Sequence, residues 1–169
     1  MEFKQVIKTR EAVRKFKQNE QISKVQLDSI LEAGRIAPTA KNIQPQRIIV
    51  VQSGDGLTKI DKASPCRYGA PTVLLVCSDT SSAFRKDGHS TYEVDACIVA
   101  THMMLQATDV GVDNIWIELF DRDTIKKEFE LEEGVEPICL IPLGYRTEDY
   151  AGSQNYNNRK SLEETVIYR

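Results

Sequence analysis

The feature that most constrains this chain is its longest uncharged stretch, Ala96 to Thr108. It lies inside a helix predicted from Tyr92 to Val110, which Gly111 ends as the C′ residue. The stretch is shorter than the roughly 20 apolar residues of a membrane span, so we expect no membrane insertion. Because the helix is nearly apolar through its middle, we expect it to be buried centrally or to lie at a subunit interface. One side is predicted to carry Val94, Cys97, Ile98, Thr101, Leu105 and Thr108, with Met104 beside them.

Short apolar runs alternate with helical patterns along the rest of the chain, which predicts a layered α+β or mixed α/β structure. Strands are expected at residues 47–51, 72–77, 114–117 and 137–143. Helices are expected from Phe3 into the basic stretch at Lys8–Lys17, from the Ser23–Gln26 capping box up to Pro38, within 55–62, and from Asp121 to Phe129. The polar tail at 147–158, with Tyr150 and Tyr156, is expected to cross the surface or a partner subunit.

Length and charge narrow the class of protein further. The chain has 169 residues and a net charge of −3, which predicts a single domain over residues 1–169 and argues against binding nucleic acid through its phosphates. The first residues are charged and lack an apolar segment, so we expect a cytoplasmic protein. The cysteines, Cys66, Cys77, Cys97 and Cys139, have no zinc-ligand spacing, and we expect reduced thiols and no metal site.

Two stretches stand out once the usual catalytic motifs have been looked for and not found. Arg10 and Arg14 are four residues apart, so a helical turn would set both guanidinium groups on one side, where they suit a phosphate. The alternative is a solvated basic face. The segment Ala37–Pro45 places amide side chains between two prolines, which fits a rigid loop facing a planar polar ligand. The alternative is a plain connection between elements.

These stretches, with others in the same order, resemble the short form of the FMN-dependent nitroreductases. The similarity covers essentially the whole chain. The matching motifs are Thr9–Phe16, Ala37–Pro45, Tyr68–Pro71, Trp116–Glu118, Leu143–Tyr145 and Asn158–Glu164. The resemblance implies an α+β nitroreductase-like fold, with a central mixed sheet flanked by helices, in a homodimer that exchanges segments and has its FMN sites at the interface.

The resemblance also implies a role for individual residues in binding FMN. The phosphate and ribityl chain would be held by Arg10, Arg14 and the backbone of Glu11 and Ala12, with Arg159 and Lys160 at the other end of the chain. The flavin would be lined from the second subunit by Pro38, Thr39, Ala40, Asn42 and Gln44. The stretch Trp116, Ile117, Glu118 and Leu119 would bring backbone amides to the flavin N5/O4 region.

The activity implied is NAD(P)H-dependent, ping-pong reduction of small acceptors such as nitroaromatics and quinones, with no catalytic side chain because the flavin carries the hydride. Two alternatives stay open. One is a specialised flavin enzyme, such as a reductive dehalogenase or a ring oxidase. The other is a protein that stores or senses FMN without turnover.

Overall fold

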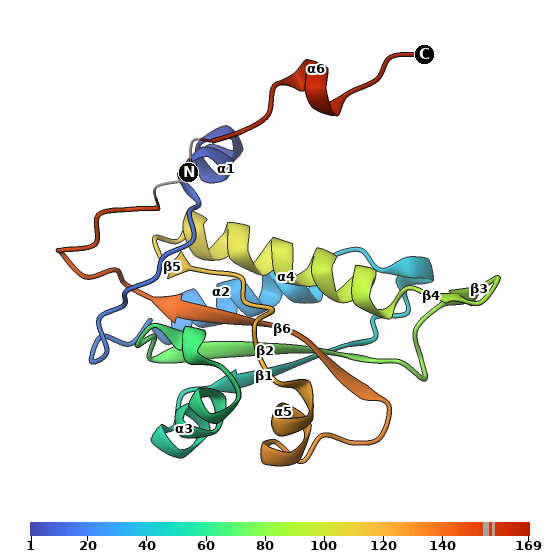
Figure 1. Ribbon diagram of the computed structural model, residues 1–169, viewed down its shortest axis with the longest axis horizontal. Coiled ribbons are helices and arrows are strands. Elements are labelled where there is room, and N and C mark those ends of the chain that lie inside the picture. The colour runs from blue at the N-terminus through green and yellow to red at the C-terminus, as the bar shows by residue number, and fades with distance from the viewer. Residues whose placement is uncertain (154–155, 157) are drawn as a thin grey trace.

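The computed structural model describes residues 1–153, 156 and 158–169, and Figure 1 shows the arrangement of its elements. The helices and strands follow one another as α1 (Phe3–Thr9), α2 (Lys24–Arg35), η1 (Ala40–Asn42), β1 (Gln46–Val51), α3 (Gly54–Ala63), η2 (Pro65–Arg67), β2 (Thr72–Asp79), β3 (Arg85–Lys86), β4 (His89–Ser90), α4 (Tyr92–Asp109), β5 (Asp113–Asn114), α5 (Arg122–Glu128), β6 (Val135–Gly144) and α6 (Leu162–Thr165).

The central sheet has the strand order β1-β2-β6-β5, and its neighbouring strands are antiparallel. A parallel bridge between Ala12 and Asn114 adds the N-terminal segment to the edge at β5, so the sheet is mixed, as expected. β2 lies between β1 and β6 and is buried along nearly its whole length. A strand that is covered on both faces is apolar at successive positions, which is why the run TVLLVC predicted this strand.

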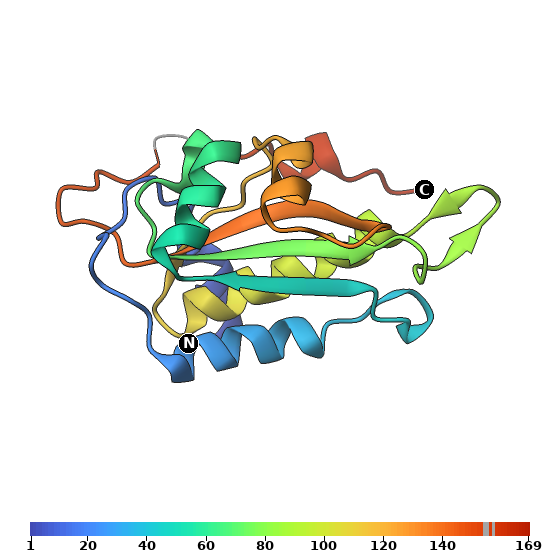
Figure 2. The same cartoon turned by 90° about the horizontal axis from the view of Figure 1, so that it is seen from below.

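Helices cover both faces of this sheet (Figure 2). Alternate side chains of β2 point to opposite faces. Leu74 and Val76 belong to the core under α2 and α4, whereas Val73, Leu75 and Cys77 belong to the core that includes residues of α3 and α5. The fold is therefore the layered α+β arrangement that the alternating pattern predicted.

The long helix α4 ends within one residue of its predicted end, but the side that it buries differs from the one the apolar residues indicated. The buried side is made of three alanines with Val99, Met103 and Asp95, whereas Val94 on the predicted side is 59% exposed. The reason is the close packing of α2: a Cβ on Gly34 would lie 2.8 Å from the Met103 side chain. Only small side chains allow such an approach. The buried residues of α4 are Asp95, Ala96, Val99, Ala100, Met103 and Ala107.

Two predicted boundaries are wrong, and one short element was not predicted. α1 stops at Thr9 instead of running into the basic stretch. The strand predicted at 114–117 is only β5, after which Ile117 makes an isolated bridge to Leu140. The short hairpin of β3 and β4 was not predicted, because two-residue strands leave no periodic signal. Of the predicted surface tail 147–158, residues 154–155 and 157 lie outside the described residues.

Candidate functional site

The segment from Arg10 to Phe16 is extended, so the predicted helical turn that would align Arg10 with Arg14 is wrong. The Val13 N–H donates to the Asn114 carbonyl at 3.2 Å, and the Phe16 N–H is also paired outside the segment. The Val13 and Phe16 side chains are buried. Their backbone N–H groups therefore bond to neighbouring elements instead of to the preceding turn of a helix. In an extended chain the two arginine Cα atoms can be up to about 13 Å apart, a distance that suits an elongated ligand.

Arg10 is half-buried and lines a cavity of about 190 Å³ at the carboxyl end of α4. Within the described part of the chain, no carboxylate forms an ion pair with Arg10 or Arg14. The guanidinium group of Arg10, without a carboxylate partner among the described residues, suits an anionic ligand in this polar hollow. The hollow is smaller than the usual 300–1,000 Å³ of a complete ligand pocket. It is lined by Met1, Thr9, Arg10, Glu11, Thr108, Gly111, Val112, Asp113, Asn114 and Arg146.

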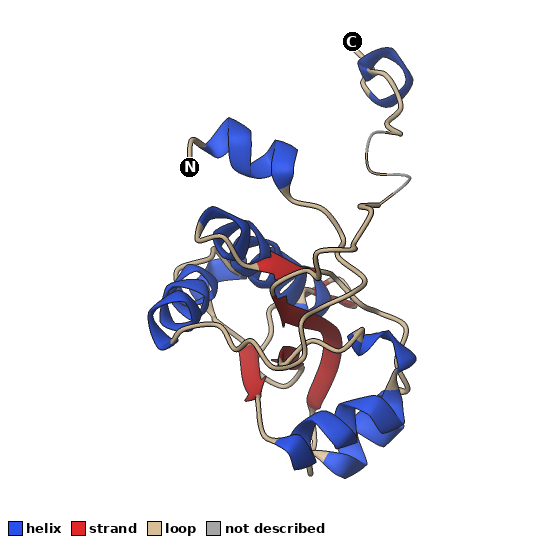
Figure 3. Ribbon diagram, turned by 90° about the vertical axis from the view of Figure 1, so that its left-hand side faces the viewer, coloured by secondary structure: helices blue, strands red, loops and turns tan. Residues whose placement is uncertain are grey.

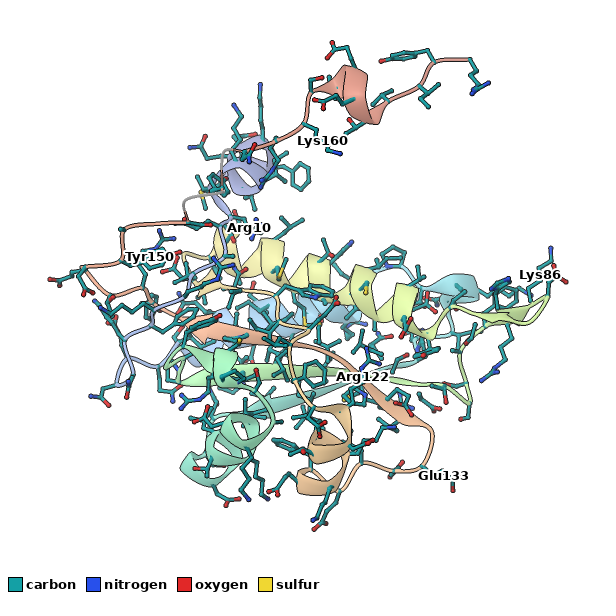
Figure 4. The ribbon with its side chains drawn as sticks, in the orientation of Figure 1. Arg10, Lys86, Arg122, Glu133, Tyr150 and Lys160 are labelled. Carbon is teal, nitrogen blue, oxygen red and sulfur yellow. The ribbon has the colours of Figure 1, made fainter. Side chains whose placement is uncertain are left out.

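An ion-pair network that the sequence did not indicate fixes the wall of this cavity. Arg146 donates to Asp113 at 2.5 Å and to Glu11, both of which are largely buried carboxylates. Hydrogen bonds to Asp113, followed by the charge of the two carboxylates, raise the pKa of Arg146 above its ordinary value. Figure 4 shows the side chains in this region around Arg10. Arg146, Asp113 and Glu11 are far apart in the sequence, so no spacing pattern predicts this network.

Asn114 lines the same cavity and is fixed by its side-chain amide. Its Nδ2 donates to the Met104 carbonyl at 3.2 Å and to Thr108 Oγ1 at 3.1 Å, which fixes the orientation of the amide. Its Oδ1 is buried, and no residue in the described ranges donates to it. This oxygen has essentially no exposed surface, so it is an unsatisfied buried acceptor that does not open onto the hollow.

Arg14 belongs to a second, more aromatic group. It interacts with the hydroxyl of Tyr68, whose pKa is raised chiefly by a hydrogen bond with Cys66 and next by desolvation. Tyr150 packs in the same region and donates from its hydroxyl to the Ala12 carbonyl at 2.9 Å. Arg10 and Arg14 thus face different surroundings, one polar and one partly aromatic.

The predicted stretch from Trp116 to Leu119 forms a loop beside β6 that several hydrogen bonds fix in place. Ile117 exchanges backbone hydrogen bonds of 2.9 Å with Leu140, and the Trp116 Nε1 donates to Glu118 at 2.9 Å. The buried Ser64 hydroxyl donates to the Leu119 carbonyl at 2.7 Å. Glu118 and Leu119 are themselves exposed, so this loop presents fixed backbone to the surface.

The other predicted loop lies at the opposite end of α4. The Ala40 N–H donates to the Asp95 carboxylate at 2.8 Å, whereas Thr108 lines the Arg10 cavity. A helix of 18 residues is about 27 Å long, so one chain does not bring the two parts together. The predicted residues of this loop are all accessible: Pro38, Asn42 and Gln44 are exposed, and Thr39 and Ala40 are half-buried.

The C-terminal residues form an arm that stands away from the body of the chain (Figures 1 and 3). Residues 158–169 are exposed throughout, including Arg159 and Lys160. Arg159 lies over the Tyr156 ring at 5.7 Å from its centroid. The arm carries apolar side chains into solvent, among them Leu162, Ile167 and Tyr168, which are between 72% and 91% exposed.

Within the described part of the chain, none of the helices has the length and apolar character needed to cross a membrane.

Comparisons with known proteins place this geometry in context. Residues 7–68 and 61–145 match the model of the Nitroreductase family. A protein of Methanothermobacter thermautotrophicus, named as a candidate NADH dehydrogenase/NAD(P)H nitroreductase, is 32% identical over 88% of this chain and 80% of its own length. The crystal structure of a nitroreductase family protein from Clostridium difficile 630 is 36% identical, with a TM-score of 0.93 over 99% of this chain and 98% of its own.

A third structure shares the fold at low sequence identity. It is a nitroreductase-type protein from Exiguobacterium sibiricum, solved in complex with FMN, which is 20% identical with a TM-score of 0.85 over the full length of this chain and 98% of its own.

Proposed function

The chain belongs to the nitroreductase family, and we propose that residues 1–169 form one FMN-binding domain of an NAD(P)H-dependent oxidoreductase. The observation that carries the proposal is the pair of arginines without carboxylate partners, Arg10 and Arg14, spread along one extended segment beside a partial cavity. FMN is elongated and anionic at one end, so it fits both the charge and the spread of these groups.

We assign the phosphate to Arg10 with the backbone of Glu11 and Ala12, because Arg10 lines the polar cavity. Arg14 lies four residues on, beside Tyr68, and is assigned to the part of FMN nearer its ring. This division replaces the predicted joint grip of both arginines on the phosphate, which required a helical turn. Charge-assisted contacts of this kind are the strong ones available to a protein. The arm residues Arg159 and Lys160 complete the phosphate site in the assembled protein.

The assembled protein is proposed to be a homodimer with two sites at its interface. Two features support this: the loop at 38–44 and the Arg10 cavity lie at opposite ends of α4, and α4 leaves Val94 exposed on an apolar side. A second copy in the reverse orientation would bring the loop of one chain to the cavity of the other. The flavin-lining residues from that copy are Pro38, Thr39, Ala40, Asn42 and Gln44.

Bound FMN would supply the redox chemistry, taking hydride from NAD(P)H and passing electrons to a small acceptor such as a nitroaromatic or quinone in a ping-pong cycle. The residues of the chain would position the flavin and stabilise the negative charge that develops on it. The loop at Trp116, Ile117, Glu118 and Leu119 is held by Leu140 and Ser64, and the Ile117 N–H is already used on Leu140, so the amides of Glu118 and Leu119 are the ones that would face the ring. Fixed N–H groups favour negative charge on the ring.

The test is a reduction experiment on the purified yellow protein. The pigment released by heat should chromatograph as FMN at about one per chain. Mixing with NADH or NADPH without oxygen should bleach the flavin rapidly, and a nitroaromatic or quinone should restore its colour. Recovery of FAD, or failure to take up any flavin, would contradict the proposal. A flavin that no nicotinamide reduces would indicate storage or sensing. Reduction without reoxidation by either acceptor would indicate a specialised flavin enzyme.

A further inference from the structure

Asp95 is a buried carboxylate that the activity proposed above does not use. Its side chain is 2% exposed, near the start of α4. Oδ1 accepts a hydrogen bond of 2.8 Å from the Ala40 N–H, and Oδ2 accepts one of 2.7 Å from the Thr91 hydroxyl. Within the described residues, no cation forms an ion pair with it. A buried charge is costly unless it is hydrogen-bonded, and these two contacts offset part of that cost.

The loop that Asp95 holds has a strained backbone. Lys41, Asn42 and Gln44 have φ values of 51°, 56° and 58°, the left-handed region that residues with a Cβ rarely adopt. Three such residues within four positions persist only where the surroundings impose the conformation. Backbone strain of this kind gathers at ligand-binding loops, and this is the loop assigned to the flavin.

The other contacts of the loop are exposed or lie within it. The Gln44 N–H donates to Thr39 Oγ1 at 3.0 Å, and the Lys41 ammonium lies 4.4 Å from the centroid of the Phe84 ring. The hydrogen bond from Ala40 to Asp95 differs, because it joins the loop to a buried, charged acceptor on the rigid helix α4. Hydrogen bonds to charged groups are about twice as strong as neutral ones.

We propose that Asp95 is a positioning residue that fixes the loop at residues 39–44 in its strained form, and so preshapes the part of the flavin site that one subunit offers to the other. The inference rests on the FMN site proposed above. A preshaped loop adds to affinity because no conformational entropy is lost in ordering it when the ligand binds. Asp95 touches no flavin in this account and acts only through the backbone of Ala40.

The experiment measures the FMN dissociation constant and the thermal midpoint of the full-length apoprotein for three variants. Asp95→Ala removes the acceptor and should weaken FMN binding about 10-fold or more. Asp95→Asn keeps an oxygen for the Ala40 N–H but not the charge, so it should lose part of the affinity and clearly less than Asp95→Ala. Thr91→Val removes only the other partner of the carboxylate, and should leave FMN affinity within about 3-fold of the parent.

If Asp95→Ala does not fold, a variant at Ala40, the donor of the same hydrogen bond, still tests the inference. Ala40→Pro deletes the donor, and Thr39 already has the extended backbone, φ −132° and ψ 160°, that a following proline favours. It should weaken FMN binding as Asp95→Ala does, and the double variant should be no weaker than either single one. Hydrogen exchange of the Ala40 amide should also be faster in Asp95→Ala than in Asp95→Asn.

Two results would overturn the inference while leaving the FMN site intact. In the first, the parent binds FMN and Asp95→Ala binds it equally well. In the second, Asp95→Asn loses as much affinity as Asp95→Ala, which would mean that charge and not the bond to Ala40 matters. A parent protein that takes up no FMN would instead contradict the proposed function. In that case the exchange rate of the Ala40 amide still tests whether Asp95 holds the loop at residues 39–44.

Discussion

Arg146 and Asp113 form the most extensive side-chain pair in the described structure. The Asp113 carboxylate accepts from Arg146 Nη2 at 2.5 Å, from Nε at 3.0 Å and from the Arg146 backbone N–H at 2.7 Å. The same guanidinium also contacts Glu11, so one cation joins the N-terminal segment to the end of the sheet. The position of Glu11 beside the Arg10 cavity depends on this cation.

Replacing Arg146 by methionine should therefore lower the free energy of unfolding. Asp113 and Glu11 would lose their partner while their side chains are only 19% and 13% exposed. Lost hydrogen bonds between charged groups cost about 1.5–3 kcal/mol, and the lower end applies because Arg146 itself is 40% exposed. Urea denaturation measures the change. Lys24→Met, which breaks the exposed pair with Asp28, should change stability much less, and equal losses would contradict the network.

The proposed division of FMN between Arg10 and Arg14 is tested with riboflavin, which lacks the phosphate. Arg10→Ala should weaken FMN binding about 10- to 150-fold and leave riboflavin binding unchanged, because it removes a contact to a charged group. Arg14→Ala should weaken both ligands by similar factors. Fluorescence titration of the apoprotein gives the dissociation constants.

The control for these arginines is Lys17→Ala, since Lys17 pairs on the surface with Glu20 at 3.2 Å and should have little effect on either ligand. An Arg14→Ala defect confined to FMN would mean that both arginines hold the phosphate.

The exposed apolar side of α4 should be an interface between two copies. Val94→Asp introduces a charge where Val94 is 59% exposed, and it should shift the protein toward monomers in sedimentation or light scattering. Obligate interfaces bury upwards of about 2,000 Å² and tolerate unpaired charge poorly. Val25→Asp is the matched control, because Val25 is 79% exposed on α2 and should leave the dimer intact.

The C-terminal arm should contribute to the same dimer. Deleting residues 161–169 removes Leu162, Ile167 and Tyr168, which contact solvent in the single chain. The truncated protein should dissociate at higher concentration than the parent and bind FMN more weakly. Unchanged assembly after truncation would show that the arm does not pack on a partner.

Stability should fall at alkaline pH because of Cys77. Burial, and next the charge of Glu136, raises the pKa of this thiol from 9.0 to about 12. Between these values the unfolded chain loses the proton while the folded protein keeps it, so the unfolded state binds fewer protons and stability decreases as pH rises. Urea midpoints from pH 8 to 11 measure the slope. The slope should be shallower in Cys77→Ala, and an identical slope would show that the decline has another origin.

Much of the fold was predictable because its elements follow local rules. The Ser23–Gln26 capping box begins α2, both of its reciprocal hydrogen bonds are present, and β2 falls on the continuous apolar run. The end of α1 and the extended course of Arg10 to Phe16 were not predictable. Val13 and Phe16 are buried against elements distant in the sequence, and that burial overrides the local helical spacing.

The sequence by itself determined the layered fold, the long helix and the order of the motifs that identify the family. These depend on periodicity and on residue types that act over a few positions. Only the tertiary structure decided which side of α4 faces the core, because Gly34 on α2 leaves the room that the Met103 side chain fills. It also brought Asp95 to Ala40 and Arg146 to Asp113. Such pairs depend on how distant segments pack against one another, which local sequence patterns do not encode.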